Sequence, residues 1–179
     1  MKAELILTPT GLLGFGRRIP VSIGRRGVTC AKREGDGATP AGLHRISGLF
    51  WRPDRLRRPA PWAEPIGPKD LWCDAPDHPL YNRHARAPFA ASHECLRRAD
   101  PLYDLIFTTD WNAAGHAGQG SAIFLHQWRR PGFRTAGCIA MSRANLIWLA
   151  RRAAPGTRLF VSSVWKYSGA RGSAPHSSV

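Results

Sequence analysis

The sequence predicts a mostly β fold in which mixed sheets form a twisted sandwich or a partly closed barrel, with one helix after Cys138. The 179 residues include 18 glycines and 15 prolines, which favour many turns and short strands over long helices. Apolar residues occur in short runs bounded by turn formers, and a single segment carries both a helix start signal and a stop signal. Hydrophobic residues make up 43% of the chain, which is enough for one domain to bury a core.

The first third of the chain predicts strands that are separated by turns. Residues 3–8 and the apolar run 12–15 flank a Pro-Thr-Gly turn and predict a β-hairpin, and residues 20–24 alternate apolar and polar side chains as a third strand would. A run of turn formers over residues 35–42 predicts a loop. Residues 43–51 then return to the composition of a strand.

The rest of the chain predicts a loop excursion, two core strands, the helix and a last strand. Residues 52–101 sustain no hydrophobic period and contain many prolines, so we expect a long irregular excursion folded over one end of the core. The predicted elements that follow are core strands at 103–109 and 121–126, a helix from Arg143 to about Ala154 that Ser142 caps and Pro155 stops, and a strand at 157–163. Residues 1–167 are expected to form one domain, and residues 168–179 a disordered tail.

The charge balance is strongly basic. There are 26 Lys and Arg against 12 Asp and Glu, a net charge of +14. Such a charge attracts nucleic acid, anionic membranes or an anionic cell-wall polymer, but a bias toward arginine codons would produce the same excess. A nucleic-acid-binding protein is therefore a distant alternative, because no recognised motif supports it.

The cysteines and the amino terminus exclude several classes. The four cysteines contain no C-x-x-C pair, and the spacing of Cys73, His78, His84 and Cys95 matches no common zinc module, so we expect no metal. The amino terminus shows no apolar stretch long enough for a signal peptide, and no segment has the length of a membrane span. Oligomeric state cannot be read from these features.

The strongest chemical signal lies between residues 121 and 141. His126 ends an apolar strand, and the segment Thr135-Ala136-Gly137-Cys138 follows shortly after it. A cysteine nucleophile needs a base within hydrogen-bond reach and backbone N–H groups aimed at the developing oxyanion. Cys138 and His126 are therefore the candidate nucleophile and base. A buried structural thiol and a core histidine are the alternative interpretation.

This segment resembles the signature of the YkuD-like L,D-transpeptidases, in which a histidine is followed by Ser/Thr-x-Gly-Cys. Thr135, Gly137 and Cys138 fill the defined positions, His126 fills the upstream one, and residues 35–42 resemble the Gly-x-x-Thr-Pro-x-Gly element of the same domains. The resemblance implies a thioester acyl-enzyme formed at Cys138 on a peptidoglycan stem peptide. It also implies a backbone role for Gly137 near the oxyanion, a location in the periplasm or cell wall, and no cofactor; because no signal peptide is visible, the cytoplasm is the alternative location. Thr135 is either an orienting hydroxyl or a turn residue.

Two departures separate the chain from many members of that family. Ala136 stands where those members have His, and Ala140 where they have Arg, so the chain resembles a divergent Gly-Cys-x-Ala-Met branch that includes hydrolases. An L,D-carboxypeptidase or an amidase-like hydrolase using the same Cys/His pair is therefore the alternative activity. Within the resemblance, Tyr81, Asn82 and His93 are candidates to line a donor cleft, or they brace the excursion.

Arginines follow the candidate base. Arg134 is a further candidate for binding a substrate carboxylate and, with Arg129 and Arg130, for lowering the pKa of the Cys138 thiol, unless these side chains form a solvated turn. A histidine-paired thiol is expected to have a lowered pKa and to react fastest of the four cysteines.

Overall fold

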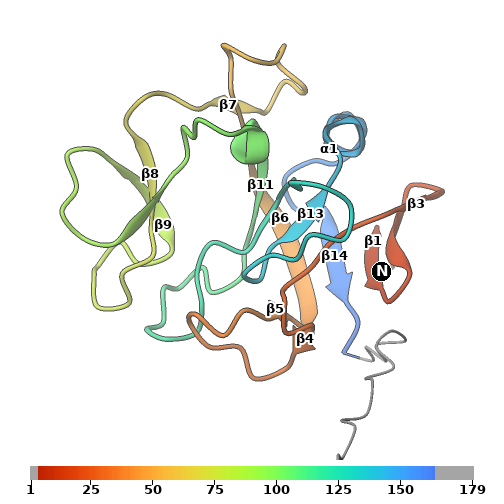
Figure 1. Cartoon of the computed structure of the whole chain (residues 1–179), viewed down its shortest axis with the longest axis horizontal. Coiled ribbons are helices and arrows are strands. Elements are labelled where there is room, and N and C mark those ends of the chain that lie inside the picture. The colour runs from red at the N-terminus through yellow and green to blue at the C-terminus, as the bar shows by residue number, and fades with distance from the viewer. Residues whose placement is uncertain (1–3, 164–179) are drawn as a thin grey trace, which may run out of the picture.

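A computed structural model describes residues 4–163 and shows a molecule built almost entirely of strands (Figure 1). Its one α-helix within this range is α1 (Arg143–Ala150), and a short 3-10 helix spans Pro101–Tyr103. The main sheet has nine strands. Their order is β13 (Ile139–Met141), β12 (Phe124–Gln127), β11 (Leu105–Thr109), β6 (Gly42–Trp51), β14 (Arg158–Val161), β1 (Leu5–Thr8), β2 (Gly11–Gly14) and β3 (Arg17–Ile19), with β7 (Glu64–Pro65) paired to β6.

The central strand β11 is buried along its whole length, and its side chains divide between two cores. Leu105 and Phe107 pack into the larger apolar cluster, whereas Ile106 packs into a second cluster on the other face. Successive side chains of a strand point to opposite faces, so a strand buried on both sides reads as a continuous apolar run. The prediction of a core strand at 103–109 is confirmed over β11, residues 105–109. The predicted strand at 121–126 is confirmed over its last three residues, which belong to β12.

The sheet is mixed and nearly closes on itself. Strands β12 and β13 are parallel, as are β1 and β14, whereas β6 is antiparallel to both β11 and β14. The segment after β3 crosses to the opposite edge of the sheet, where Ser22 forms an antiparallel bridge with Ala140 of β13. The predicted mostly β fold of mixed sheets with one helix is therefore confirmed in its partly closed form.

The opening hairpin is confirmed, but the third strand lies elsewhere. Strands β1 and β2 pair antiparallel, and β3 pairs with β2 over Arg17–Ile19 rather than over 20–24. Residues 20–24 make only isolated bridges, at Ser22 and Gly24. Their alternation reflects a connection between two edges, buried at Ser22 and Ile23, and not a strand of the sheet.

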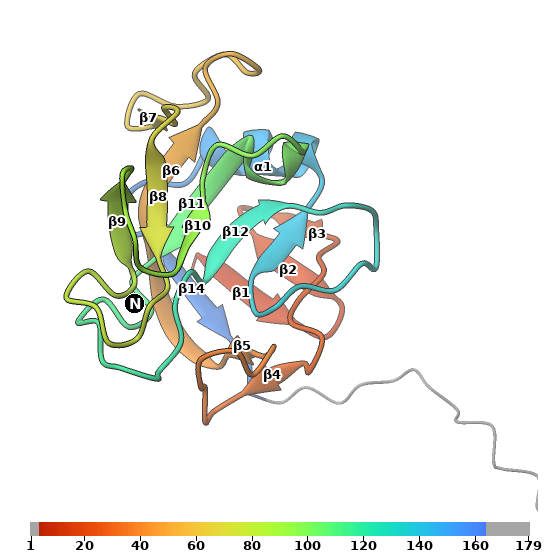
Figure 2. The same ribbon diagram turned by 60° about the vertical axis from the view of Figure 1, so that its left-hand side comes forward.

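The segment 52–101 is not irregular as predicted. It contains a second sheet of three strands in the order β10 (His93–Cys95), β8 (Asp70–Cys73) and β9 (Arg83–Arg86), which lies to the left of the main sheet in Figure 1 and in front of it in Figure 2. Each strand has at most four residues, too few for alternation to show in sequence. A third small sheet pairs β4 (Val28–Thr29) with β5 (Thr39–Pro40).

The helix begins as predicted and ends earlier. The Ser142 hydroxyl accepts a hydrogen bond from the Asn145 N–H, and α1 ends at Ala150, ahead of the turn that leads to Pro155 and Gly156. Strand β14 then confirms the predicted last strand within residues 157–163. The predicted tail, 168–179, lies outside the described residues. No helix among residues 4–163 is long and apolar enough to cross a membrane.

Candidate active site

The parallel pairing of β12 and β13 brings Cys138 and His126 to one cavity. His126 lies opposite Ala140 in the register, and Cys138 comes two residues before Ala140, at the start of β13. Because alternate residues of a strand share a face, the side chains of all three lie on the same side of the sheet. Both Cys138 and His126 line a cavity of about 200 Å³, as does Ala140.

The Cys138 thiol is buried and protonated. Its Sγ donates to the carbonyl oxygen of Ala122 at 3.1 Å. Burial raises the pKa of Cys138 to about 12, and the nearby Glu94 carboxyl contributes in the same direction. The expectation of a lowered thiol pKa is therefore wrong for the resting site, because desolvation outweighs every favourable partner. Cys30 and Cys95 are exposed, so neither is protected from electrophiles as Cys138 is.

His126 is also neutral, and its tautomer is fixed. Its Nδ1 lies 2.8 Å from the carbonyl oxygen of Gln127, which can only accept, so Nδ1 carries the proton and Nε2 keeps its lone pair. Burial lowers the pKa of His126 to about 4. The ring of Tyr103 packs edge-on against the imidazole, with centroids 5.3 Å apart. A neutral imidazole with a free Nε2 has the protonation state of a general base.

A hydroxyl bridge shapes the turn that carries Cys138. Thr135 Oγ1 donates to the Cys138 carbonyl at 2.6 Å and accepts from the Gly137 N–H at 3.1 Å. Gly137 has φ of +151°, and a Cβ there would lie 2.9 Å from the Ala38 carbonyl oxygen, so only glycine fits without a shift. The Gly137 N–H is thus already bonded to Thr135, whereas the backbone N–H of Phe124 interacts with the sulfur.

The segment of residues 35–42, which includes β5, holds this turn in place. The buried Thr39 hydroxyl donates to the Gly137 carbonyl at 2.7 Å and accepts from the Gly24 N–H at 3.0 Å. Ala38 packs its backbone against Gly137. The two sequence elements that resembled one family are therefore in direct contact, although Thr39 and Gly137 are 98 residues apart.

The sequence matches the L,D-transpeptidase catalytic domain (YkuD) over residues 15–161, well over half of the chain. The chain belongs to this family. An L,D-transpeptidase from Mycobacterium smegmatis is a similar solved structure, at 14% identity and a TM-score of 0.44; the match covers 90% of this chain and 59% of that one. The chain thus spans about three fifths of that protein's length. No curated protein matches the sequence.

Two of the residues suggested for the donor cleft of this YkuD domain are buried in its framework. Tyr81 is 1% exposed and its hydroxyl donates to Glu34, while burial and Glu34 raise its pKa. Asn82 is 8% exposed and its amide is fully engaged with backbone and indole groups. Neither lines the cavity of Cys138, so the bracing interpretation fits both.

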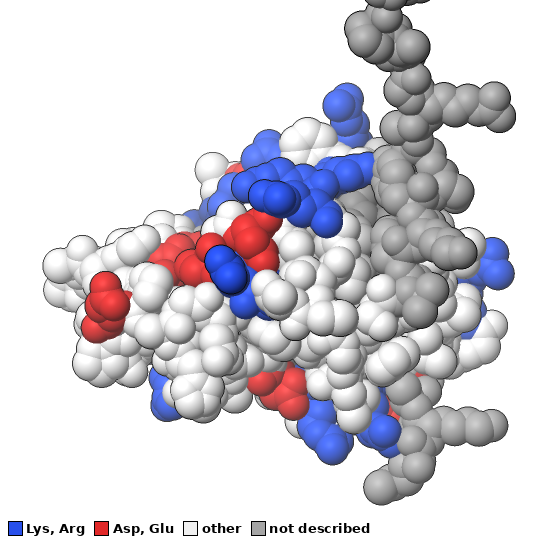
Figure 3. Space-filling view, turned by 90° about the horizontal axis from the view of Figure 1, so that it is seen from below, with Lys and Arg blue, Asp and Glu red and all other residues white. Residues whose placement is uncertain are grey.

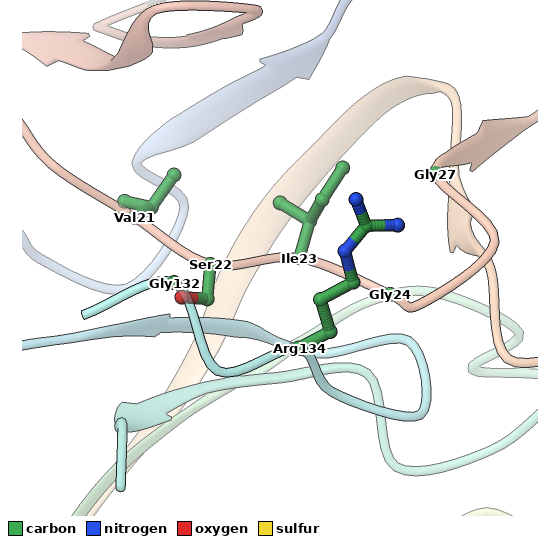
Figure 4. Close-up of a pocket in the computed structure, with 7 residues that line it drawn as sticks. All are labelled: Val21, Ser22, Ile23, Gly24, Gly27, Gly132 and Arg134. Atoms are coloured by element: carbon green, nitrogen blue, oxygen red, sulfur yellow. The ribbon is translucent and has the colours of Figure 1, made fainter. Parts of the chain in front are cut away.

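The other two suggested residues differ in their relation to the cavity. His93 bonds the Ala91 carbonyl through Nδ1 at 2.7 Å and lies outside the cavity of Cys138. Arg134 does line that cavity, and it also lines a neighbouring groove of about 220 Å³ beside Ser22 and Gly24. Figure 4 shows its side chain extending across the 21–24 segment, and its Nη1 donates to the Arg25 carbonyl at 2.9 Å.

Sequence reasoning missed Glu94 and Tyr103. Glu94 lines the cavity of Cys138 together with Tyr103, whose hydroxyl donates to the Glu94 carboxyl. Burial raises the pKa of Glu94. His93 is a candidate from the sequence, and Glu94 is the next residue of the same strand, β10. Adjacent residues of a strand face opposite sides, so Glu94 faces the sulfur and His93 faces away from it.

Basic side chains do not form one continuous surface on the face shown in Figure 3. Lys and Arg lie there in several separate groups, with Asp and Glu between them. Many arginines are paired, as Arg55 and Arg143 are with the buried Asp104. Among residues 4–163, no group of three or more His, Cys, Asp and Glu side chains is placed to hold a metal ion.

Proposed function

We propose that this YkuD domain transfers acyl groups of peptidoglycan stem peptides through a thioester at Cys138, with His126 as the base. The observation that carries the proposal is the shared cavity, in which a neutral His126 with a free Nε2 lies on the same sheet face as the thiol. The arrangement needs no cofactor, because nucleophile, base and backbone donor all come from the chain.

The reaction begins with both groups neutral. As Sγ bonds to the carbonyl carbon between an L-centre and a D-residue, the thiol proton moves to His126 Nε2 and the carbonyl electrons move to the oxygen. Backbone N–H groups near Cys138 would stabilise that oxyanion. Collapse breaks the C–N bond, and the imidazolium returns its proton to the leaving amine. The pKa values of about 12 for the thiol and about 4 for the imidazole disfavour a thiolate–imidazolium pair in the resting site, so proton transfer and attack are coupled.

Two cavities meet at Cys138, which suits transfer between two substrates. The larger has apolar walls and is rimmed by Arg129 and Arg134. The smaller, of about 90 Å³, is lined by polar groups that include Lys32 and Ser121. Glu94, Ala136 and Cys138 belong to both cavities. One thioester can therefore be formed from a donor and attacked by an acceptor on different sides.

Hydrolysis at the same site is the second candidate. Ala136 borders both cavities and Ala140 borders the larger, so neither supplies a donor or a charge beside the thioester. Water as acceptor makes the enzyme an L,D-carboxypeptidase or an amidase-like hydrolase. In either version the partners are peptidoglycan stem peptides, and the place of action is the periplasm or cell wall.

The test is capture of the acyl-enzyme. Purified protein is incubated with muropeptides, and intact-protein mass spectrometry should show an adduct of the acyl-group mass. Cys138→Ala should abolish the adduct. Cys73→Ala is the matched control, because Cys73 is a buried thiol outside both cavities and its loss should leave the adduct in place. An adduct that persists in Cys138→Ala would refute the assignment.

A further inference from the structure

Ala122 adopts a backbone conformation that residues with a Cβ rarely hold. Its φ is +51°, in the left-handed region, and it directly precedes the segment that enters β12. The Ala122 carbonyl is also the acceptor of the Cys138 thiol, at 3.1 Å. The position of the sulfur's partner therefore depends on whatever holds Ala122 in this conformation.

Asn82 holds it. Asn82 Oδ1 accepts the buried Ala122 N–H at 2.9 Å and the Trp72 indole N–H at 3.1 Å. Its Nδ2 donates to the carbonyls of Trp111 at 2.7 Å and Asn112 at 3.0 Å. Two acceptor and two donor positions are thus filled. The reversed amide would set its NH₂ against two N–H donors, so the orientation is fixed.

The residues on either side of Ala122 are anchored separately. The Ser121 hydroxyl donates to Glu34 at 2.8 Å, and the Thr109 hydroxyl donates to the Ile123 carbonyl at 2.8 Å. Residues 121, 122 and 123 are therefore each fixed by one side chain from a different segment, namely Glu34, Asn82 and Thr109 in that order. Of these three side chains, Asn82 is the one that bonds Ala122, whose carbonyl contacts the sulfur.

We propose that Asn82 is a positioning residue for the nucleophile, acting through Ala122 on Cys138. The proposal rests on the proposed role of Cys138. By fixing Ala122, Asn82 sets the acceptor of the resting thiol and the path of the backbone into β12. The Phe124 N–H, two residues further, favours the thiolate. The same short backbone segment thereby serves both protonation states of the sulfur.

The variant that isolates this role is Asn82→Gly. Asn82 itself has φ of +57°, which glycine adopts freely, so the substitution removes the side chain without straining the backbone. Asn82 lines neither cavity at Cys138. We expect kcat for muropeptides to fall roughly tenfold to a hundredfold, as misplacement of a reacting group by about 1 Å does, while KM stays near the wild-type value.

A second readout does not require turnover. The rate of Cys138 alkylation by iodoacetamide is measured by peptide mass spectrometry between about pH 6 and 10. Because the Cys138 pKa of about 12 lies above this range, the pH profile consists of the rate at each pH and not of a titration midpoint. In Asn82→Gly the pH profile of Cys138 should shift, while the exposed Cys30 and Cys95 report unchanged reagent chemistry. If wild-type protein alkylates at Cys138 but turns over no muropeptide, the proposed function fails and this arm still tests Asn82.

The matched control is Phe15→Gly. Phe15 also has a left-handed φ, +48°, but its ring packs against Trp148 and lines neither cavity at Cys138. Its loss should leave the kcat and the Cys138 profile at wild-type values. If Phe15→Gly loses as much activity per folded molecule as Asn82→Gly, the effect is one of general stability and the proposal is wrong.

Two variants at Ala122 complete the test. Ala122→Gly removes the penalty for the left-handed conformation, so adding it to Asn82→Gly should recover part of the lost kcat. Ala122→Val leaves Asn82 intact but disfavours that conformation, and it should reproduce the kcat loss and carry the test if Asn82→Gly does not fold. A wild-type kcat and pH profile in Asn82→Gly, or in a folded Ala122→Val, would overturn the proposal.

Discussion

At the scale of single residues, burial away from water keeps both the Cys138 thiol and the His126 imidazole neutral. Desolvation raises the pKa of Cys138 and lowers that of His126, and the two effects have the same physical cause. A permanently charged pair would have to be stabilised in this buried place by further groups. The resting site avoids that cost, and under the proposed mechanism the proton moves only as the sulfur attacks a substrate carbonyl carbon.

His126→Ala tests the base. We expect acylation of Cys138 to slow by roughly a hundred- to ten-thousandfold, the effect of losing a positioned general base, while the melting temperature changes little. Single-turnover formation of the acyl-enzyme with muropeptides measures the rate. His116→Ala, in an exposed loop, is the control and should acylate at the wild-type rate. A folded His126→Ala protein with wild-type acylation would make the histidine structural.

The lowered pKa of His126 also predicts how stability depends on pH. Between about 6.5 and 4, the unfolded chain binds a proton at this histidine and the folded protein does not, so the free energy of unfolding falls as the pH falls. The loss should approach roughly 3 kcal/mol below the folded pKa. Urea denaturation of wild type and His126→Ala at pH values above and below this window measures the difference. Parallel stability curves would contradict it.

The sequence could reveal a site residue only where a short local pattern encodes its role. Cys138, His126 and Thr135 sit in a short local pattern, so they could be named. Glu94 could not be separated from His93, because the facing of a three-residue strand is set by its partner β8 and not by its own sequence. Asn82 was named as a candidate for a donor cleft or for bracing the excursion, and only the structure shows that its contacts run to residues 111, 112 and 122.

At the scale of elements, the turn that carries Cys138 is held by a loop far away in sequence. The Thr39 hydroxyl joins the Gly24 N–H to the Gly137 carbonyl, and the backbone of Ala38 touches Gly137. A buried hydroxyl that both donates and accepts leaves two groups unpaired when it is lost. The loop at residues 35–42 therefore acts as the support of the nucleophile turn rather than as a plain connection.

Thr39→Val tests this support, because valine keeps the shape and removes the hydroxyl. Leaving the buried Gly24 N–H unsatisfied should lower the free energy of unfolding by about 1–3 kcal/mol, and the acylation rate per folded molecule should fall as well. Urea denaturation and single-turnover acylation measure the two effects. Thr10→Val, at an exposed turn, serves as control. A destabilised variant that acylates at the wild-type rate would limit Thr39 to a structural role.

Elements were predicted best where their own residues decide them. The buried run of β11, the opening hairpin and the cap of α1 by Ser142 carry local signals, and each was found. Strands β8, β9 and β10 exist through pairing with one another, so the proline-rich segment that contains them looked irregular. Residues 20–24 had the alternation of a strand but bridge two edges instead.

At the scale of the whole molecule, the near closure of the sheet places the site. The edge strand β13 pairs with the crossing segment at Ser22, and Cys138 immediately precedes the same strand. The small sheet of β8, β9 and β10 supplies Glu94 from the other side. The main sheet and the small sheet thus both line the cavity of Cys138, whereas the crossing segment pairs with β13 without lining that cavity.

The composition of those walls predicts the fate of the acyl-enzyme. Ala136 and Ala140 leave the surroundings of the thioester small and apolar, so a large, hydrated acceptor amine finds little to replace its water, whereas water or a small acceptor loses less. We expect hydrolysis, or exchange with small D-amino acids, to exceed formation of stem-to-stem cross-links. Incubating the purified enzyme with muropeptides and quantifying shortened, exchanged and cross-linked products in one chromatogram measures the partition.

In Ala136→His and Ala140→Arg, which add donors or charge, the share of cross-linked product should rise. Mostly dimeric product from the wild-type enzyme would refute this preference and leave Cys138 and His126 in their proposed roles.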